Sequence, residues 1–195
     1  MRVLKSRFVK SATKQKEYTD IDFSEIAFVG KSNVGKSSLI NRILERKLIA
    51  KVSSTPGKTR LINFFEAKLE KNDFTNCFLS LVDLPGYGYT KVKPSFNWEK
   101  MIVDYFNDRK QLKAVFFLSD IRHGLNQRDK LMIDMIRDIK LPFYHVLTKA
   151  DKLPKNRVKK VVYDSVITTN KSHFSALRRV GIAPIYKWLE DVVLV

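Results

Sequence analysis

Gly30-Lys31-Ser32-Asn33-Val34-Gly35-Lys36-Ser37-Ser38 directly follows the apolar run Ile26-Ala27-Phe28-Val29. The stretch meets the pattern G-x-x-x-x-G-K-[ST] in full, which predicts a strand, a phosphate-binding loop and a helix in succession. The two glycines allow backbone conformations that other residues avoid, so successive N–H groups can converge on a phosphate. Lys36 adds a positive charge and Ser37 a hydroxyl for Mg²⁺, at a helix N-terminus that favours anions. A chance Gly-rich turn is the alternative, and the strand-loop-helix context disfavours it.

The length and composition indicate one globular domain. A chain of 195 residues is long enough for one well-filled core and short for two. No stretch approaches the length of a membrane span, and no apolar segment follows the basic N-terminus as in a secretory signal. The single cysteine excludes an internal disulfide and is typical of a reducing compartment. We therefore expect a cytoplasmic protein that does not contact a membrane.

The charge is unusually positive. Thirty-seven Lys and Arg against twenty Asp and Glu leave a net charge of +17, which favours polyanionic partners through counterion release. The charge alone leaves RNA, DNA and acidic lipid open as such partners. Residues 1–24 carry six basic residues before the first acidic one. We expect them to form a basic N-terminal arm, either the first strand of the domain or a partly mobile segment, that is equally compatible with solvent exposure and with nucleic-acid contact.

Apolar strand patterns alternate with helical patterns along the remaining chain. Strands are predicted at 61–65, 74–82, 114–118 and 142–147, and helices at 38–44, 98–106, 127–139, from 154 onward and at 185–193. Asn126 and Asp129 are placed to cap the helix at 127–139. One apolar stripe is expected on that helix, formed by Leu131, Met132, Met135, Ile136 and Ile139. The alternation predicts an α/β fold, with a mostly parallel sheet and helices on both faces.

Two further motifs fall at the carboxyl ends of predicted strands, where such sheets bind ligands. Asp83-Leu84-Pro85-Gly86 stands where P-loop NTPases place the acidic residue that orders Mg²⁺, followed by a backbone N–H that reads a γ-phosphate. Thr148-Lys149-Ala150-Asp151 supplies a carboxylate that can accept two hydrogen bonds from guanine, whereas adenine offers no such pair of donors. The Lys149 stem can lie along the base plane. Together with the phosphate loop, these motifs predict guanine nucleotide binding.

The chain resembles the small Ras-like GTPases, and most closely the bacterial EngB family, also called YihA or YsxC. The resemblance rests on residues 25–41, Ser54-Thr-Pro-Gly-Lys-Thr-Arg60, Val82-Asp-Leu-Pro-Gly-Tyr-Gly-Tyr89 and Leu147-Thr-Lys-Ala-Asp151, and it spans most of residues 8–193. It implies a three-layer P-loop NTPase fold, a Ras-like G domain at 25–195, and a GTPase that assists assembly of the large ribosomal subunit. The family is needed for normal growth, division and septation. Its expected partners are the large subunit or its precursor and ribosomal RNA, and we expect a monomer.

The resemblance also implies roles for individual residues. The nucleotide would be held by Gly30, Lys31, Ser32, Asn33, Val34, Gly35, Lys36, Ser37, Ser38, Gly57, Lys58, Thr59, Arg60, Leu61, Asp83, Leu84, Pro85, Gly86, Thr148, Lys149, Ala150, Asp151, Phe174, Ser175 and Ala176. Mg²⁺ would be held by Ser37, Thr59 and Asp83, and catalysis would involve Asn33, Lys36, Thr59 and Gly86. The match at 174–176, the loop behind the base, departs from the family's usual polar loop, and the segment before it is short for a strand.

One position bears on the rate of hydrolysis. Tyr87 follows the Asp-x-x-Gly motif where many GTPases place a glutamine that orients the attacking water, so we expect slow intrinsic hydrolysis. Asn33 resembles the asparagine with which related GTPases hold K⁺ in place of an arginine finger, and stabilisation of the loop is an equal alternative. Two other functions are compatible with the same fold. One is an RNA-binding scaffold whose guanine nucleotide is structural, and the other is a P-loop ATPase or kinase.

Overall fold

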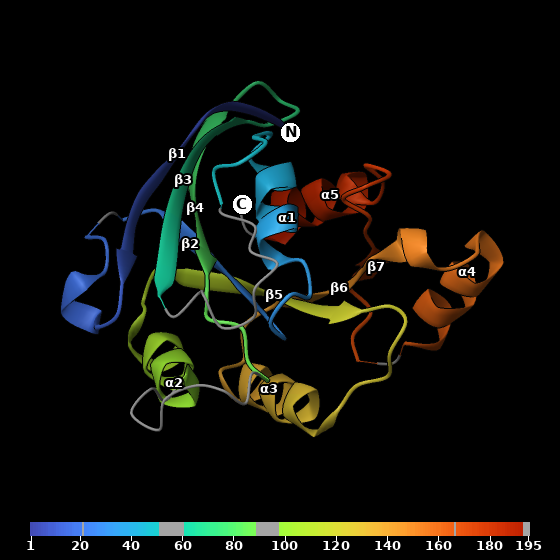
Figure 1. The fold of residues 1–195 in the computed structure, drawn as a ribbon. Helices are drawn as coiled ribbons and strands as arrows, with labels where there is room; N and C mark the ends of the chain where they lie inside the picture. Colours follow the sequence, from blue (N-terminus) through green and yellow to red (C-terminus); the bar gives the residue numbers. More distant parts are fainter. Residues whose placement is uncertain (21, 51–60, 89–97, 166, 193–195) are drawn as a thin grey trace.

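The computed structural model describes residues 1–20, 22–50, 61–88, 98–165 and 167–192, which form an α/β domain around one sheet (Figure 1). In chain order, the described elements are β1 (Arg2–Ala12), η1 (Gln15–Glu17), β2 (Ser24–Gly30), α1 (Lys36–Ile43), β3 (Ile62–Glu70), β4 (Asn76–Asp83), α2 (Trp98–Asp108), β5 (Leu112–Asp120), α3 (Gln127–Asp138), β6 (Phe143–Thr148), η2 (Ala150–Lys152), α4 (Lys155–Asp164), β7 (Lys171–His173) and α5 (Ile182–Val192).

The seven strands lie in the order β1-β3-β4-β2-β5-β6-β7. β1 and β3 pair antiparallel, as do β3 and β4, while the run from β4 to β7 is parallel. β2 lies between β4 and β5, so the chain winds away from it in both directions. A reversal of this kind opens a crevice at the carboxyl end of the strand, which is where a nucleotide-binding loop is expected.

Both faces of the sheet are buried, because successive side chains of a strand point to opposite faces. In β2, Ile26 and Phe28 join the core under α1 and α5, whereas Ala27 and Val29 join the core over α2 and α3. Figure 1 shows α1 beside α5 on one face and α2 with α3 on the other. The continuous apolar runs of the sequence therefore correspond to strands covered on both sides, and the predicted three-layer fold is confirmed.

Local differences from the sequence-based predictions have simple causes. The second strand of the β3–β4 hairpin begins at Asn76 rather than Phe74, because Phe74 takes a left-handed conformation (φ 64°) in the turn and is 81% exposed. On α3, Asn126 and Asp129 form the predicted reciprocal cap. The prediction of Leu131 in the apolar stripe was wrong: Leu131 is 52% exposed and Ile133 is buried instead, since the buried face follows Asp129 at spacings of three, four and seven residues.

Within the described ranges, the helices are too short or too polar to cross a bilayer.

Candidate nucleotide-binding site

The phosphate loop connects β2 to α1 at the centre of the sheet. Gly30 has a φ of +157°, and a Cβ added there would lie 2.6 Å from the carbonyl oxygen of Leu118 on β5. Asn33 and Gly35 also have positive φ values, of 61° and 116°. Alternating backbone signs of this kind turn consecutive N–H groups toward a common point. The loop therefore has the backbone geometry expected of an anion site at the start of α1.

Lys36, Ser37 and Asp83 meet at the foot of this loop. The β2–β4 register pairs Phe28 with Asp83, which brings the aspartate beside the start of α1. The Ser37 hydroxyl donates to Asp83 Oδ2 over 3.2 Å, and Lys36 Nζ lies 3.9 Å from Asp83 Oδ1. Burial raises the pKa of Asp83 and lowers that of Lys36, while the charge of each opposes the shift in the other.

The same residues fit a Mg²⁺ ion. Asp83 Oδ1 is buried and accepts no hydrogen bond from the described part of the chain, so one carboxylate oxygen has unused capacity. Carboxylate and hydroxyl oxygens are the ligands that Mg²⁺ prefers. Thr59, the third predicted ligand, lies outside the described residues, as do Gly57, Lys58 and Arg60. The described pair Ser37 and Asp83 can therefore supply two of the three predicted contacts.

Gly86 and Tyr87 tie the Asp83 segment to the phosphate loop. A Cβ on Gly86 would lie 2.8 Å from Ser32 Cα and 3.1 Å from Lys36 Nζ, so only glycine fits this approach. The Ser32 N–H donates to the carbonyl oxygen of Tyr87 over 2.9 Å. Between Asp83 and Gly86, Leu84 and Pro85 are buried.

The Tyr87 side chain is fully buried and points into the domain. Its hydroxyl donates to Asp129 Oδ1 at 2.7 Å, at the N-terminal cap of α3. Burial and this hydrogen bond raise the pKa of Tyr87, so the phenol stays protonated. A side chain held in this way is not available to orient water at a phosphate, which agrees with the expectation from the sequence that Tyr87 does not replace the usual glutamine.

Thr148 supports the phosphate loop. Its hydroxyl makes contacts of 2.6 Å to the carbonyl oxygen of Val34 and 3.0 Å to that of Ser119, and its side chain is 1% exposed. The hydroxyl is thus used within the protein, between the phosphate loop and β5. Thr148 therefore supports the phosphate loop, and its predicted contact with guanine stays a prediction.

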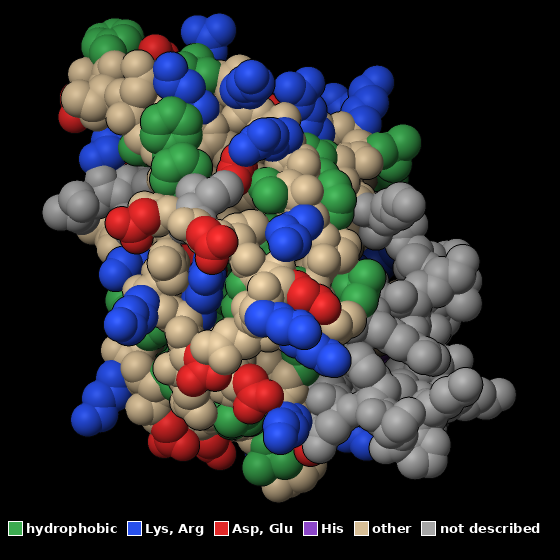
Figure 2. Space-filling view, turned by 90° about the vertical axis from the view of Figure 1, so that its left-hand side faces the viewer, with side chains coloured by type: hydrophobic (Ala, Val, Ile, Leu, Met, Phe, Trp, Pro, Cys, Tyr) green, Lys and Arg blue, Asp and Glu red, His purple; other side chains and the backbone are tan. Residues whose placement is uncertain are grey.

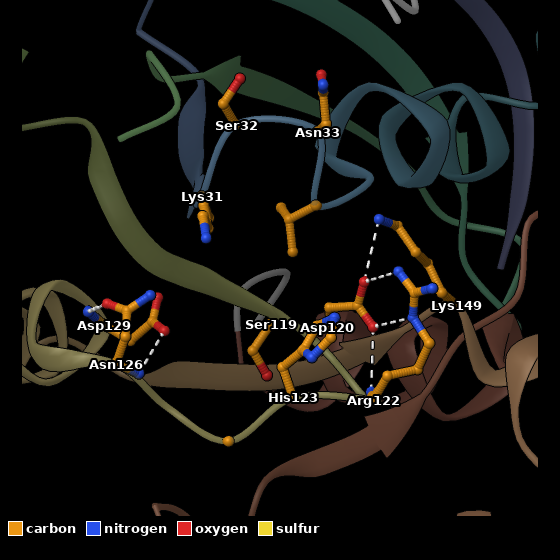
Figure 3. Close-up of a pocket in the computed structure, with 12 residues that line it drawn as sticks. Lys31, Ser32, Asn33, Ser119, Asp120, Arg122, His123, Asn126, Asp129 and Lys149 are labelled. Carbon is orange, nitrogen blue, oxygen red and sulfur yellow. Dashed lines mark hydrogen bonds and ion pairs between the residues drawn. The ribbon is translucent and has the colours of Figure 1, made fainter. Parts of the chain in front are cut away.

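Lys149 is held by an ion pair that the sequence did not predict. Its Nζ lies 3.1 Å from Asp120 Oδ2, and Arg122 donates to both oxygens of the same carboxylate, at 2.9 and 2.7 Å (Figure 3). Burial alone would raise the pKa of Asp120, but the hydrogen bonds from Arg122 and Lys149 lower it well below its usual range. The signal in the sequence is an acid at the end of an apolar strand, followed by Arg two residues later.

Asp151, the predicted guanine acceptor, is oriented by the loop that follows β7. Its Oδ1 accepts a 2.6 Å hydrogen bond from the Ser175 hydroxyl, which lowers the pKa of Asp151 and keeps it ionised. The Ala150 N–H donates to the carbonyl oxygen of Phe174. Ser175 and Phe174 are buried, and Ala176 is exposed beyond them. The structure therefore brings residues 148–151 and 174–176 together.

The remaining predicted contacts surround these groups. A cavity of about 250 Å³ lies beside the phosphate loop, lined in part by Lys31, Ser32, Asn33 and Val34 and, across from them, by Asp120 and Lys149. In Figure 3 the Asn33 side chain points away from Asp120 and Arg122. Ser38 lies in the first turn of α1, whereas Leu61 is 38% exposed just before β3.

Comparisons with known proteins agree with this geometry. Residues 25–149 match the family described as 50S ribosome-binding GTPase. The chain is 45% identical over 162 residues to a probable GTP-binding protein EngB of Bacillus cereus (strain G9842), covering 82% of this chain and 78% of that protein. It is 42% identical over 200 residues to the probable GTP-binding protein EngB of Trichlorobacter lovleyi, covering 99% and 98%.

A similar fold occurs in the crystal structure of a variant of Aquifex aeolicus Era bound to GDP.AlF4-, with a TM-score of 0.70 at 23% identity over 88% of this chain and 57% of that one. The family implies a bound guanine nucleotide and usually Mg²⁺. The chain therefore belongs to the EngB family of GTP-binding proteins, and it is a GTPase with the Ras-like P-loop fold.

Proposed function

We propose that this GTPase is a switch that assists assembly of the large ribosomal subunit, acting as a monomer on the subunit or its precursor. The observation that carries the proposal is the match of residues 25–149 to the family of 50S ribosome-binding GTPases. Effects on growth, division and septation would follow from a reduced supply of ribosomes, and the cytoplasm is the compartment in which that substrate occurs.

The charge distribution supports a polyanionic partner. The net charge is +17, and β1 exposes Arg2, Lys5, Arg7 and Lys10 along the edge of the sheet. Figure 2 shows this side of the molecule, where Lys and Arg side chains gather in the upper part. Lys155, Arg157, Lys159 and Lys160 on α4 add a second basic element. Each phosphate neutralised by such residues releases counterions, which favours binding to RNA.

The contacts of Gly86 suggest how nucleotide changes the protein. The Gly86 segment lies on the phosphate loop and is tied to it by the Ser32 N–H to Tyr87 hydrogen bond. A γ-phosphate that accepts from the Gly86 N–H would compete with this arrangement, because both need the space between the two segments. We propose that GTP repositions residues 83–88 and that hydrolysis restores the contact, which changes the surface offered to the particle.

Slow intrinsic hydrolysis is part of the proposal, because Tyr87 is buried on Asp129 and supplies no water-orienting group. A K⁺ ion held by Asn33 is the proposed activator, compensating charge as an arginine finger does. Turnover measured in K⁺ and in Na⁺ tests this role. Equal rates in the two salts would leave Asn33 as a residue that stabilises the loop.

Co-sedimentation with purified large subunits, in GDP and in a non-hydrolysable GTP analogue, tests the proposed function. We expect the protein to sediment with the subunit in the GTP-analogue state and to be released in GDP. Equal sedimentation in both nucleotides, together with no turnover in the presence of subunits, would favour the RNA-binding scaffold instead. Absence of binding in either state would contradict both.

A further inference from the structure

A second cavity, of about 630 Å³, lies outside the phosphate loop. We call it the α1–α5 groove. It is lined by Ser38, Asn41, Arg42, Glu45, Arg46, Lys47, Ala176, Arg179, Ile182 and Tyr186. Its walls come from α1 and the residues after it on one side, and from the 176–182 loop and α5 on the other. Figure 1 shows α1 and α5 side by side at this place.

The groove is strongly basic. Its lining holds four cationic residues and one acidic residue, Glu45; the cationic residues are Arg42, Arg46, Lys47 and Arg179. Among the residues that the structure describes, none of the four cations lies within ion-pair distance of an acid. In contrast, Arg7 on the basic edge strand β1 is already paired with Glu66 at 2.7 Å. The positive charge of the groove is therefore uncompensated within the described structure.

Arg42 is a cation of the groove whose hydrogen-bonding capacity is not fully used within the described structure. Its Nε is buried and has no hydrogen-bond partner in the described part of the chain. A buried donor without an acceptor is unfavourable, and because the Arg42 residue as a whole is only partly buried, a ligand in the groove can supply acceptors to the accessible part of its guanidinium. The guanidinium is planar and matches the paired oxygens of a phosphate.

Other polar groups of the groove are already used. The Asn41 side chain donates to the carbonyl oxygen of Ala50 at 2.8 Å and accepts from its N–H at 2.7 Å. The Tyr186 hydroxyl donates to the carbonyl oxygen of Ile43 at 3.0 Å. Arg46 Nε also donates to the Ser6 hydroxyl at 3.0 Å. These bonds fix the walls of the groove and leave mainly cationic groups to meet a ligand, so the groove is suited to an anion with little base-specific readout.

We propose that the α1–α5 groove binds the phosphate backbone of an RNA strand. The inference rests on the proposed function, which places the protein on a ribosomal particle, and it names the surface that makes the contact. A phosphodiester supplies two non-bridging oxygens to each guanidinium, and successive phosphates can be met from the two walls by Arg42 and Arg179.

The position of the groove connects RNA binding to the nucleotide site. Ser38 follows Ser37 directly, and Ala176 follows the Ser175 that orients Asp151. Ser38 and Ala176 are themselves among the predicted nucleotide contacts, so the groove and the predicted site share one residue in each wall. RNA in the groove and nucleotide in the site should change each other's affinity by the same factor, because coupling between two binding sites is reciprocal.

The test uses the full chain and a fluorescein-labelled 20-nucleotide oligouridylate, with affinity read from fluorescence anisotropy at several KCl concentrations. In the double variant Arg42→Gln with Arg179→Gln we expect at least tenfold weaker binding. The slope of log affinity against log salt should fall by about 1.4, which is about 0.7 for each lost phosphate contact. Binding of a fluorescent GDP without RNA should stay within twofold of the wild type.

A matched control removes the same charge elsewhere. Lys110 and Lys113 are exposed at the start of β5. The affinity of the variant Lys110→Gln with Lys113→Gln for the oligouridylate should fall less than threefold. Equal losses in the two variants would overturn the proposal, because net charge alone would then explain them. If the groove variant fails to fold, Arg46→Gln with Lys47→Gln alters two exposed residues of the same groove and is expected to show the same salt effect.

Co-sedimentation of these variants with large subunits separates this inference from the proposed function. If the wild type and the groove variant bind subunits equally well, the proposal that the groove binds RNA is contradicted, whereas the proposed function is not. Binding of the wild type to subunits but not to the oligouridylate would assign the groove to an acidic protein surface instead of RNA. Absence of wild-type binding to subunits would contradict the proposed function itself.

Discussion

Asp120 fixes a lysine that is predicted to cover the guanine base. Lys149 is a long side chain in a left-handed backbone conformation (φ 59°), and Asp120 restrains its ammonium group at 3.1 Å. Restraining a flexible cation before binding reduces the conformational entropy that is lost when the nucleotide binds. Asp120 is therefore a positioning residue, which acts on the nucleotide through Lys149.

The variant Asp120→Asn is expected to weaken binding of fluorescent GDP about three- to tenfold, mainly through faster dissociation, because Lys149 loses its counter-charge. Stopped-flow displacement measures the dissociation rate. The companion Arg122→Gln keeps the carboxylate beside Lys149 and should change the dissociation rate less than twofold. Equal effects of the two variants would show that the cluster stabilises the loop rather than positioning Lys149.

Tyr87 has a structural role. In Tyr87→Phe the carboxylate of Asp129 loses a buried donor, so the free energy of unfolding should fall by about 1–3 kcal/mol. Urea denaturation measures this change. Turnover of GTP should remain within twofold of the wild type, since the hydroxyl points into the domain. A tenfold drop in turnover with unchanged stability would assign the hydroxyl to catalysis.

At the scale of elements, the middle of β6 is joined to its neighbours through His145. Its ring nitrogens lie 2.8 Å from the Ser119 hydroxyl of β5 and 3.2 Å from the Ser165 hydroxyl after α4. Burial, with a smaller contribution from Lys171, lowers the pKa of His145 to about 4. The neutral ring is therefore part of the packing between these elements.

This burial makes stability depend on pH. Above the pKa of the unfolded chain, about 6.5, both states hold His145 neutral and the contribution to stability is complete. Between 6.5 and about 4 only the unfolded state takes up the proton, so the free energy of unfolding should fall by about 3 kcal/mol in total. Urea denaturation of His145→Gln should show a flatter dependence in this window. His123→Gln, which alters an exposed ring, should keep the wild-type dependence.

The sequence predicts most elements because the core strands are apolar, and three of them, β2, β4 and β6, end at a motif. Asp83 and Thr148 close strands whose residues are buried on both faces, so their position at one edge follows from the parallel order. The role of Asp120 could not be predicted in this way. It depends on the register that pairs Asp120 with Thr148, and the pairing of strands distant in sequence is a tertiary property. The prediction of Leu131 in the buried face of α3 was wrong because packing decides which face of a helix turns toward the core.

At the scale of the whole molecule, ligand binding should stabilise the domain. Mg²⁺ and GDP at one hundred times the dissociation constant should add about 2.7 kcal/mol to the free energy of unfolding. Thermal melting with and without EDTA measures the part that depends on the metal. In Asp83→Asn that part should shrink, because a neutral amide holds Mg²⁺ weakly. An unchanged EDTA effect in this variant would contradict the assignment of Asp83 to the metal.

The contact between the Thr148 hydroxyl and the phosphate loop affects how separate parts of a nucleotide would bind. Thr148 stands one residue before Lys149 in the predicted base-reading motif, and its hydroxyl contacts the carbonyl oxygen of Val34 in the phosphate loop. The parts of the protein that meet the two ends of a nucleotide therefore share one hydrogen-bonded support. Guanosine and pyrophosphate offered separately should each strengthen the binding of the other, because the first to bind orders the support that the second needs. The domain would then recognise the intact nucleotide as one object rather than as a base and a phosphate chain held side by side.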